Sequence, residues 1–114
     1  MPRILLVEDD RDVRFMIEHA LVAAGYEVDT AATMQDGIGM LYAHPHDLVI
    51  ADAKLPDGTG MEVADRAIED GVRAFIITGY GFTLPRETLK GYEILLKPLR
   101  PVEIIAAVER TLDA

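Results

Sequence analysis

The chain has 114 residues, of which 50% are hydrophobic, and this is enough to build one hydrophobic core but not two. Lys and Arg total 11 against 20 Asp and Glu, and the formal net charge of -9 argues against direct binding to nucleic acid or to an anionic membrane surface. Cysteine is absent, which excludes disulfides but fixes no compartment. No apolar run approaches the roughly 18 residues of a membrane span, and the charges at Arg3 and residues 8–10 argue against a signal peptide, so we expect one cytoplasmic domain over residues 1–114.

The first half of the chain alternates strand and helix patterns. Residues 3–7 form a short apolar run suited to a buried strand, and Asp10 or Asp12 can cap the following helix, which Gly25 ends. The apolar positions of this helix keep helical spacing at Val13, Ile17, Leu21 and Ala24. Residues 27–32 alternate like a strand, residues 33–42 predict a weaker helix because they contain two glycines, and residues 47–51 predict the third strand.

The second half continues the alternation. After a loop rich in Gly and Asp, residues 60–70 predict a helix, residues 73–78 a strand, residues 84–90 a short helix and residues 93–96 the last strand. Pro101 suits the first turn of a final helix, whose inward positions we expect to be Val102, Ile105, Val108 and Leu112. Five strands alternating with helices predict an α/β fold with a doubly wound, mostly parallel sheet covered on both faces.

Chemically active side chains stand at the ends of four of these strands. Glu8 and Asp9 follow the first strand, Asp52 follows the third, Thr78 ends the fourth, and Lys97 follows the fifth. The carboxyl ends of parallel strands meet at one edge of the sheet, where open α/β folds place their sites. Crowded carboxylates repel one another unless a cation joins them or one of them takes up a proton, and hard oxygen ligands of this kind suit Mg²⁺. The pattern therefore predicts a metal-assisted site for phosphoryl transfer.

Phosphoryl transfer gives each of these side chains a use. The Asp52 carboxylate can attack phosphorus, while a metal ion, the Lys97 ammonium and the Thr78 hydroxyl neutralise the transferred oxygens. Gly79 leaves room for the phosphoryl group. Taken singly, such residues have structural explanations, because an acidic residue after a strand commonly caps the next helix, as we expect of Asp10. Their joint placement at strand ends is what favours a site.

A second pair of candidate ligands stands around Pro45. His44 and His46 could suggest a metal site, but the short loop between them brings no further ligand nearby. A solvated turn is therefore the favoured interpretation of this segment.

The segments that carry the phosphoryl-transfer residues resemble the receiver domains of two-component response regulators. The matching stretches are ILLVEDDRDVR at 4–14, DLVIADAKLPDGTG at 47–60, FIITG at 75–79 and LLKP at 95–98. The resemblance implies a flavodoxin-like parallel sheet of five strands in the order 2-1-3-4-5, with about five flanking helices. The spacings between Asp52, Thr78 and Lys97 are shorter than in typical receivers, so the third and fourth helices should be short.

The resemblance also implies a phosphoacceptor and a metal site. Asp52 is the expected phosphoacceptor, which takes a phosphoryl group from a phosphohistidine on a sensor histidine kinase or a histidine phosphotransfer protein. Asp9, Asp52 and the backbone carbonyl of Lys54 are the expected ligands of Mg²⁺ (or Mn²⁺), and Glu8 is expected to act through water.

Further roles follow from the same resemblance. Thr78, Gly79 and Lys97 are expected to bind the phosphoryl oxygens, and Lys97 is expected to join Pro98 through a cis peptide bond. Lys54 and Tyr80 lie two places past Asp52 and Thr78, at positions that tune the lifetime of the phosphoryl group in this family.

The coupling of this site to an output surface departs from the family pattern. Most receivers carry an aromatic residue three places before the Lys, where this chain has Ile94, so Tyr80 or Tyr92 is the candidate substitute. Glycines and a proline between residues 79 and 85 predict a mobile segment over residues 80–90 rather than a stable helix.

The function expected from these residues is that of a single-domain response regulator of a kind used in bacterial signalling. Because the chain ends just after its last helix, we expect output through protein contacts made by residues 80–90, the last strand and the last helix. The downstream target is a protein of unknown identity, and the regulator is expected to be a monomer or a weak dimer. It is not expected to be an enzyme beyond its own phosphorylation and dephosphorylation.

Two other functions fit parts of the pattern. A phosphatase of the haloacid dehalogenase type would use Asp52 as nucleophile, but such enzymes usually place a second Asp where this chain has Lys54. A binding module that is never phosphorylated would also fit the fold. The presence of all five site residues, Glu8, Asp9, Asp52, Thr78 and Lys97, argues against that module.

Overall fold

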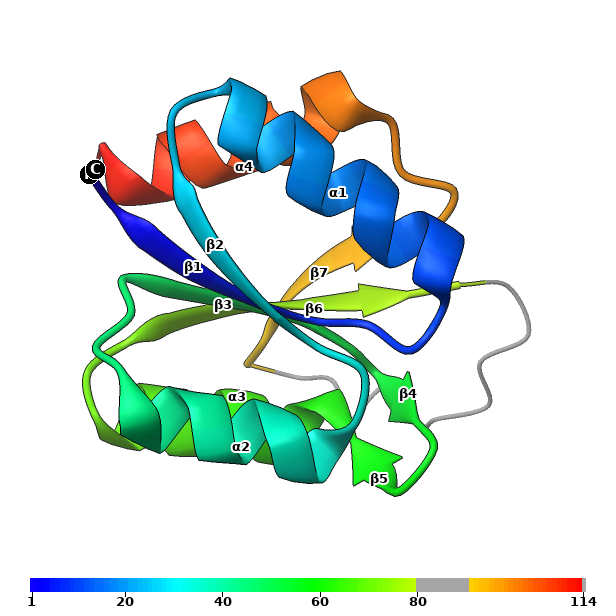
Figure 1. Cartoon of the computed structure of the whole chain (residues 1–114), viewed down its shortest axis with the longest axis vertical. Helices are drawn as coiled ribbons and strands as arrows, with labels where there is room; N and C mark the ends of the chain where they lie inside the picture. The colour runs from blue at the N-terminus through cyan, green and yellow to red at the C-terminus, as the bar shows by residue number, and fades with distance from the viewer. Residues whose placement is uncertain (80–90, 114) are drawn as a thin grey trace.

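The computed structural model describes residues 1–79 and 91–113, which form a parallel sheet between two layers of helices (Figure 1). The strands of this sheet are β1 (Arg3–Val7), β2 (Glu27–Ala31), β3 (Leu48–Asp52), β6 (Arg73–Thr78) and β7 (Glu93–Leu96), in the order β2-β1-β3-β6-β7. Every neighbouring pair is parallel. The predicted α/β class and the order 2-1-3-4-5 are confirmed, since β6 and β7 are the fourth and fifth strands of the sheet.

Four helices cover the sheet in the described part of the chain. Figure 1 shows α1 (Arg11–Ala23) and α4 (Pro101–Leu112) on one face, and α2 (Met34–Ala43) and α3 (Gly60–Glu69) on the other. The helix predicted over residues 84–90, and the mobility predicted for residues 80–90, lie outside the described residues. Within the described ranges, no helix combines the length and hydropathy needed to cross a membrane.

The first helix begins and ends where the sequence predicts. The Asp10 carboxylate accepts hydrogen bonds from the backbone N–H groups of Asp12 and Val13, at 2.9 and 3.1 Å, and so caps α1. Gly25 follows the last turn with a φ of 100°, a left-handed conformation that favours glycine. Residues close in sequence therefore determine where α1 begins and where it ends.

Side chains from alternate residues of the central strands pack into two separate cores, one on each face of the sheet. Ile4 and Leu6 of β1 belong to the core under α1 and α4, whereas Leu5 and Val7 belong to the core under α2 and α3. All four side chains are fully buried. A strand covered on both faces needs an uninterrupted apolar run, and this is why β1 lacks the polar alternation of a half-exposed strand.

The inward face of α4 differs from the prediction. Ile104, Ala107 and Val108 are its buried residues, whereas Val102 is 61% exposed and Ile105 is only half-buried. A helix buries one stripe at i, i+3 and i+4, and the stripe that faces the sheet begins at position 104. The prediction for Val102 was wrong because this apolar residue lies off that stripe.

A small antiparallel hairpin between β3 and α3 was not predicted. It consists of β4 (Lys54–Leu55) and β5 (Gly58–Thr59), and it carries Asp57 at its turn. The Asp57 carboxylate accepts hydrogen bonds from the N–H groups of Met34 and Gln35, at 2.7 and 3.0 Å, which lowers the Asp57 pKa. The hairpin therefore caps α2 from a distant part of the chain.

Ion pairs connect the amino-terminal part of the sheet. Arg3 Nε donates to Asp29 Oδ2 at 2.8 Å, and Nη2 donates to Oδ1 at 3.2 Å. Nε2 of His46 lies 2.8 Å from the same Oδ2, and the His46 side chain is fully buried. The solvated turn predicted for His44 and His46 is therefore wrong for His46, because its ring enters the space beside Asp29. His44 is exposed, as predicted.

Candidate functional site

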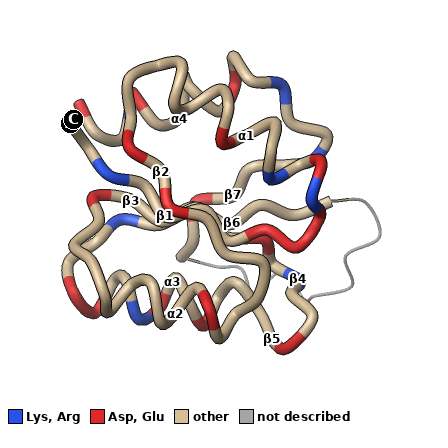
Figure 2. The backbone as a smooth tube through the Cα atoms, viewed as in Figure 1, with Lys and Arg blue, Asp and Glu red and all other residues tan. Residues whose placement is uncertain are grey.

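The carboxyl edge of the sheet brings together the polar residues that follow its strands. The turn after β1 supplies Glu8 and Asp9, and the end of β3 supplies Asp52. One carboxylate oxygen from each of these three residues lies within 4.8 Å of the others. Figure 2 shows acidic residues in the loop that follows β1. The predicted convergence of these three carboxylates is thus present.

Lys97 enters this cluster from the end of β7. Its ammonium donates a hydrogen bond to Asp52 Oδ2 at 2.7 Å and forms an ion pair with Glu8 Oε1 at 2.8 Å. The peptide bond between Lys97 and Pro98 is cis, as expected from the family resemblance. One cation therefore contacts two of the three carboxylates.

Burial changes the protonation chemistry of both partners. It raises the pKa of the Glu8 carboxyl to about 7, even though the Lys97 ammonium and the Asp10 N–H favour the charged form. For Lys97, burial alone would lower the pKa, but the hydrogen bond to Asp52 and the ion pair with Glu8 raise it above its ordinary value. The ammonium is therefore held charged between the two carboxylates.

Two polar atoms of the site lack hydrogen bonds within residues 1–79 and 91–113. They are Oγ1 of Thr78, which ends β6, and Oε1 of Glu8, whose contact with Lys97 is not aligned as a hydrogen bond. Buried polar atoms are normally satisfied, so atoms of this kind mark a place for a further binding partner. A phosphoryl oxygen would suit Thr78, and a cation or its water would suit Glu8.

Two glycines, Gly60 and Gly79, lie next to residues of the site. A Cβ at Gly60 would lie 2.1 Å from the backbone oxygen of Asp52, so no side chain fits there. A Cβ at Gly79 would lie 3.6 Å from Cβ and Cδ of Lys97, which is ordinary contact. The sequence analysis did not identify Gly60, although its place at the start of a predicted helix, three residues after Asp57, was a usable signal.

The acidic group fits a hard divalent cation. Its ligand atoms are carboxylate oxygens, one of the side chains, Asp9, is exposed, and Glu8 carries a buried oxygen without a hydrogen bond among the described residues. Mg²⁺ commonly binds through one or two carboxylates and keeps water or phosphate oxygens in its other positions. Receiver domains bind Mg²⁺ at an acidic pocket, and this group of residues has that composition.

Lys54 lies beside the phosphoacceptor candidate. Its backbone N–H donates to Asp52 Oδ1 at 3.1 Å, and its side chain is exposed at the start of β4. Both Asp52 oxygens are thus hydrogen-bonded, one to this N–H and the other to Lys97. The expected roles of the Lys54 carbonyl as a metal ligand and of its side chain in phosphoryl lifetime stay predictions.

The candidate switch residues are only partly described. Ile94 is half-buried and packs with Tyr92 against the core near Met61 and Ile76. The Tyr92 hydroxyl donates to Asp65 on α3, which raises the pKa of Tyr92 to about 12. Tyr80 lies outside the described residues. Tyr92 is therefore tied to α3 in this structure, and its role in switching stays a prediction.

Comparison with known proteins extends the similarity over nearly the whole chain. The model of the response regulator receiver domain matches residues 4–109. The response regulator receiver protein CpdR of Brucella abortus is 30% identical over 119 residues, which cover 100% of this chain and 99% of that protein. The transcriptional regulatory protein PcoR of Escherichia coli is 32% identical, over 98% of this chain and 51% of its own length. The chain thus spans about half the length of PcoR and of several other curated relatives.

Solved structures agree with the sequence comparisons. A CheY-like receiver domain protein from Methanospirillum hungatei JF-1 superimposes with a TM-score of 0.90 at 29% identity, over 99% of this chain and 94% of that one. A receiver protein from Sinorhizobium medicae WSM419 gives a TM-score of 0.86 at 27% identity, over 99% and 95%. The backbone around the acidic edge is therefore similar to that of known receivers.

Proposed function

Because the chain belongs to the response regulator receiver domain family, we propose that it is a single-domain response regulator of a two-component or phosphorelay system. Receiver domains are phosphoacceptor switches and are not generally classed as enzymes. The relative from Brucella abortus, which the chain matches over 99% of that protein's length, supports the single-domain part of the proposal.

The observation that carries the proposal is the contact between Lys97 and Asp52. The ammonium lies 2.7 Å from Asp52 Oδ2, at the end of a strand whose neighbour ends in Thr78. A phosphoryl group on Asp52 would bring negative charge to the same place, and fixed donors are most useful where charge develops. The buried Thr78 hydroxyl supplies a second donor, since it has no partner within the described residues.

The proposed reaction transfers a phosphoryl group from nitrogen to oxygen. A carboxylate oxygen of Asp52 attacks the phosphorus of a phosphohistidine on a sensor histidine kinase or a histidine phosphotransfer protein. The oxygen–phosphorus bond forms, the phosphorus–nitrogen bond breaks, and the departing imidazole takes a proton from solvent. Lys97 and Thr78 then bind phosphoryl oxygens, in space left open beside Gly79.

A divalent cation completes the proposed site. Asp9, Asp52 and the backbone carbonyl of Lys54 would hold Mg²⁺ or Mn²⁺, with Glu8 acting through water. When bound, the ion supplies positive charge to the transferred oxygens. The part played by the chain is to keep the three carboxylates within 4.8 Å of one another, so that a cation is needed to relieve their repulsion.

The proposed output is a change in protein contacts near Lys97. Leu96 on β7 is 65% exposed and Val102 on α4 is 61% exposed, which supports a protein-binding face along these two elements. Residues 80–90, with Tyr80, are predicted to take part in this output and lie outside the described residues, and Ile94 or Tyr92 would couple the face to Thr78. A weak dimer through this face is compatible with the proposal, and the net charge of -9 disfavours nucleic acid or membrane as the target.

Beryllofluoride, which mimics a phosphoryl group on an aspartate, tests the proposal directly. Amide NMR spectra would be recorded with Mg²⁺ before and after its addition, with Asp52→Asn as the control. We expect shifts at Asp9, Thr78 and Lys97 that spread into β7 and α4 in the wild type and are absent from the variant.

Other outcomes would assign a different function. No response of the wild type to Mg²⁺ and beryllofluoride would favour a binding module that is not phosphorylated. Continuous release of phosphate from an added phosphomonoester would favour a phosphatase.

A further inference from the structure

Two arginines begin α1, and they are placed differently. Arg11 is exposed and makes no hydrogen bond or ion pair with the described residues. Arg14 is half-buried, and its Nη1 donates to the backbone oxygen of Glu8 at 2.8 Å and to that of Asp9 at 3.4 Å. The second arginine thus reaches back over the helix start to the turn that carries two of the site carboxylates.

The position of Arg14 is not explained by helix stability. Cations are disfavoured near the amino end of a helix, where the backbone dipole is already positive. Asp10 already caps α1, and the Arg14 N–H donates to the Asp10 oxygen at 2.9 Å as part of the helix. The guanidinium therefore stabilises the turn that precedes α1, and it adds nothing to the capping of the helix.

Glu8 and Asp9 differ in how firmly the rest of the chain holds them. The Glu8 N–H donates to Ala31 O at 2.9 Å, and its carboxylate accepts from Asp10 N at 3.0 Å. Among the described residues, the sole hydrogen bond to Asp9 comes from Arg14. The exposed carboxylate of the metal cluster is thus the one whose backbone depends on Arg14.

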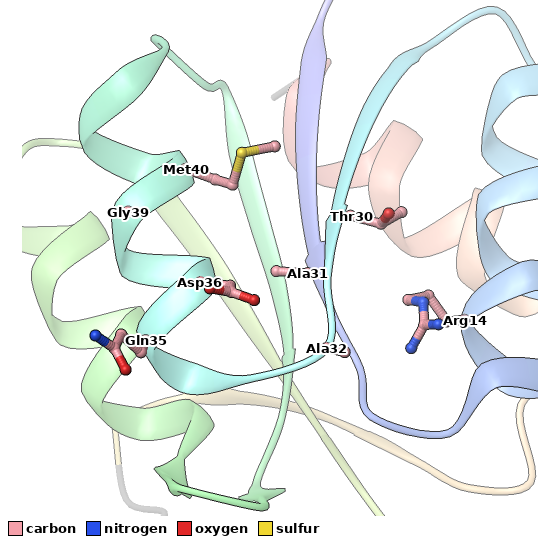
Figure 3. A pocket seen from close by; sticks show the side chains of 8 residues that line it. All are labelled: Arg14, Thr30, Ala31, Ala32, Gln35, Asp36, Gly39 and Met40. Carbon is pink, nitrogen blue, oxygen red and sulfur yellow. The ribbon is translucent and has the colours of Figure 1, made fainter.

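The surroundings of Arg14 do not force this contact. Its side chain lines an open groove of about 660 Å³ between α1 and α2, together with Thr30 and Ala32 at the end of β2 and Asp36 on α2 (Figure 3). A flexible cation beside such a space could extend into solvent at little cost in packing. Its position against two carbonyl oxygens therefore reflects the hydrogen bonds themselves.

We propose that Arg14 is a positioning residue for the metal site, which holds the backbone of Glu8 and Asp9 so that the Asp9 carboxylate faces Asp52. This inference rests on the proposed function. Both contacts come from Nη1, whose two N–H groups lie in the fixed plane of the guanidinium, whereas the Lys ammonium is a compact point charge with rotating donors.

Mg²⁺ binding by the unphosphorylated protein tests the role without relying on activity. The Mg²⁺ dissociation constant would be measured by amide NMR titration with MgCl₂ for wild type, Arg14→Gln and Arg14→Lys. Arg11→Gln is the matched control, since it removes the same charge from the same helix. Loss of a group that orients a metal ligand typically weakens metal affinity about tenfold or more, and we expect about tenfold for Arg14→Gln and a smaller loss for Arg14→Lys.

Phosphorylation by acetyl phosphate gives a second readout. A positioning role predicts that Arg14→Gln is phosphorylated slowly at low Mg²⁺ and approaches the wild-type rate when Mg²⁺ is saturating. A thermal melt in EDTA separates this effect from unfolding, because a misplaced turn should leave the melting temperature within a few degrees of that of Arg11→Gln.

The outcomes distinguish this inference from the proposed function. If wild type binds Mg²⁺ and Arg14→Gln binds it as tightly as Arg11→Gln does, the positioning role is overturned while the phosphorylation site stands. If wild type itself neither binds Mg²⁺ nor accepts a phosphoryl group, the proposed function fails.

Discussion

The two ends of the parallel sheet both bury charged side chains, but they pair them differently. At the amino end, Asp29 receives two hydrogen bonds from Arg3 and contacts the buried ring of His46. At the carboxyl end, three carboxylates lie close together and one ammonium, that of Lys97, contacts two of them. The amino end is close to balanced in charge, and the carboxyl end has an excess of negative charge.

The difference separates a structural cluster from a binding site. His46 Nδ1 is the one buried side-chain polar atom of the amino cluster without a partner among the described residues. The carboxyl end leaves Glu8 Oε1 and Thr78 Oγ1 without hydrogen bonds in the same ranges, beside unneutralised carboxylates. Buried charge alone therefore does not indicate function, whereas unbalanced charge beside unsatisfied polar atoms does.

The largest effect on stability is expected at the amino end. Asp29→Ala removes the shared partner of Arg3 and of the buried His46 ring and should lower the free energy of unfolding by about 2 kcal/mol, less than the loss of one member of a fully buried ion pair because Arg3 is partly exposed. Urea unfolding followed by circular dichroism measures this. Glu27→Ala, at an exposed residue that begins the same strand, is the control and should change stability by less than about 0.5 kcal/mol.

If Asp29→Ala lowers the free energy of unfolding no more than Glu27→Ala does, the amino cluster contributes nothing to stability. Phosphorylation of the folded Asp29→Ala variant by acetyl phosphate should match that of the wild type, because the cluster lies away from the carboxyl edge.

The contribution of Asp29 should also depend on pH. Its hydrogen bond from Arg3, with a further contribution from His46, lowers the folded-state pKa below the ordinary value of an aspartic acid. A carboxyl group whose pKa is lowered by folding contributes its full stabilisation at pH values above its unfolded-state pKa of about 4. This contribution is lost as the pH falls through the folded-state pKa. The difference in unfolding free energy between wild type and Asp29→Asn should therefore be constant near neutral pH and shrink below about pH 4. A difference that grew on acidification would contradict this sign.

Mg²⁺ should act on one end of the sheet only. At ten times its dissociation constant, a ligand specific for the folded state stabilises by about 1.4 kcal/mol. We expect MgCl₂ to raise the melting temperature of wild type and of Asp29→Asn equally, and to have much less effect on Asp52→Asn. Equal stabilisation of all three proteins would indicate that the ion does not bind at the acidic edge.

The smallest change in the free energy of unfolding is expected when a carboxylate at the carboxyl end is neutralised in the absence of metal ions. Asp52→Asn relieves repulsion among three carboxylates, and Lys97 keeps its ion pair with Glu8. In EDTA, this variant should be as stable as the wild type or more stable by up to about 1 kcal/mol. Urea unfolding would check this, and a loss as large as that of Asp29→Ala would remove the distinction between the two ends.

Much of the fold follows from local signals in the sequence. Short apolar and β-branched runs located most of the strands, with Arg73–Thr78 and Glu93–Leu96 predicted to the residue. Asp10 and Gly25 located the ends of α1, because capping depends on residues within one turn. The convergence of Glu8, Asp9 and Asp52 followed from parallel topology, and the strand order followed from the family resemblance.

Several features depend on contacts between residues far apart in the chain. His46 is buried because Asp29 lies beside it, Val102 is exposed because the sheet meets the stripe at Ile104, and Asp57 caps a helix that begins more than 20 residues earlier. None of these partners stands near in sequence, so no local pattern could indicate them.

The sequence by itself determined the strands, the first helix and the set of residues with phosphoryl-transfer chemistry, since these depend on composition and spacing within short segments. The tertiary structure alone decided which charges balance one another, why residue 60 must be glycine beside the Asp52 carbonyl, and that Arg14 holds the turn of Asp9. The physical reason is that hydrogen bonds and charge pairing act over a few ångströms, and only the folded chain brings those atoms within that distance.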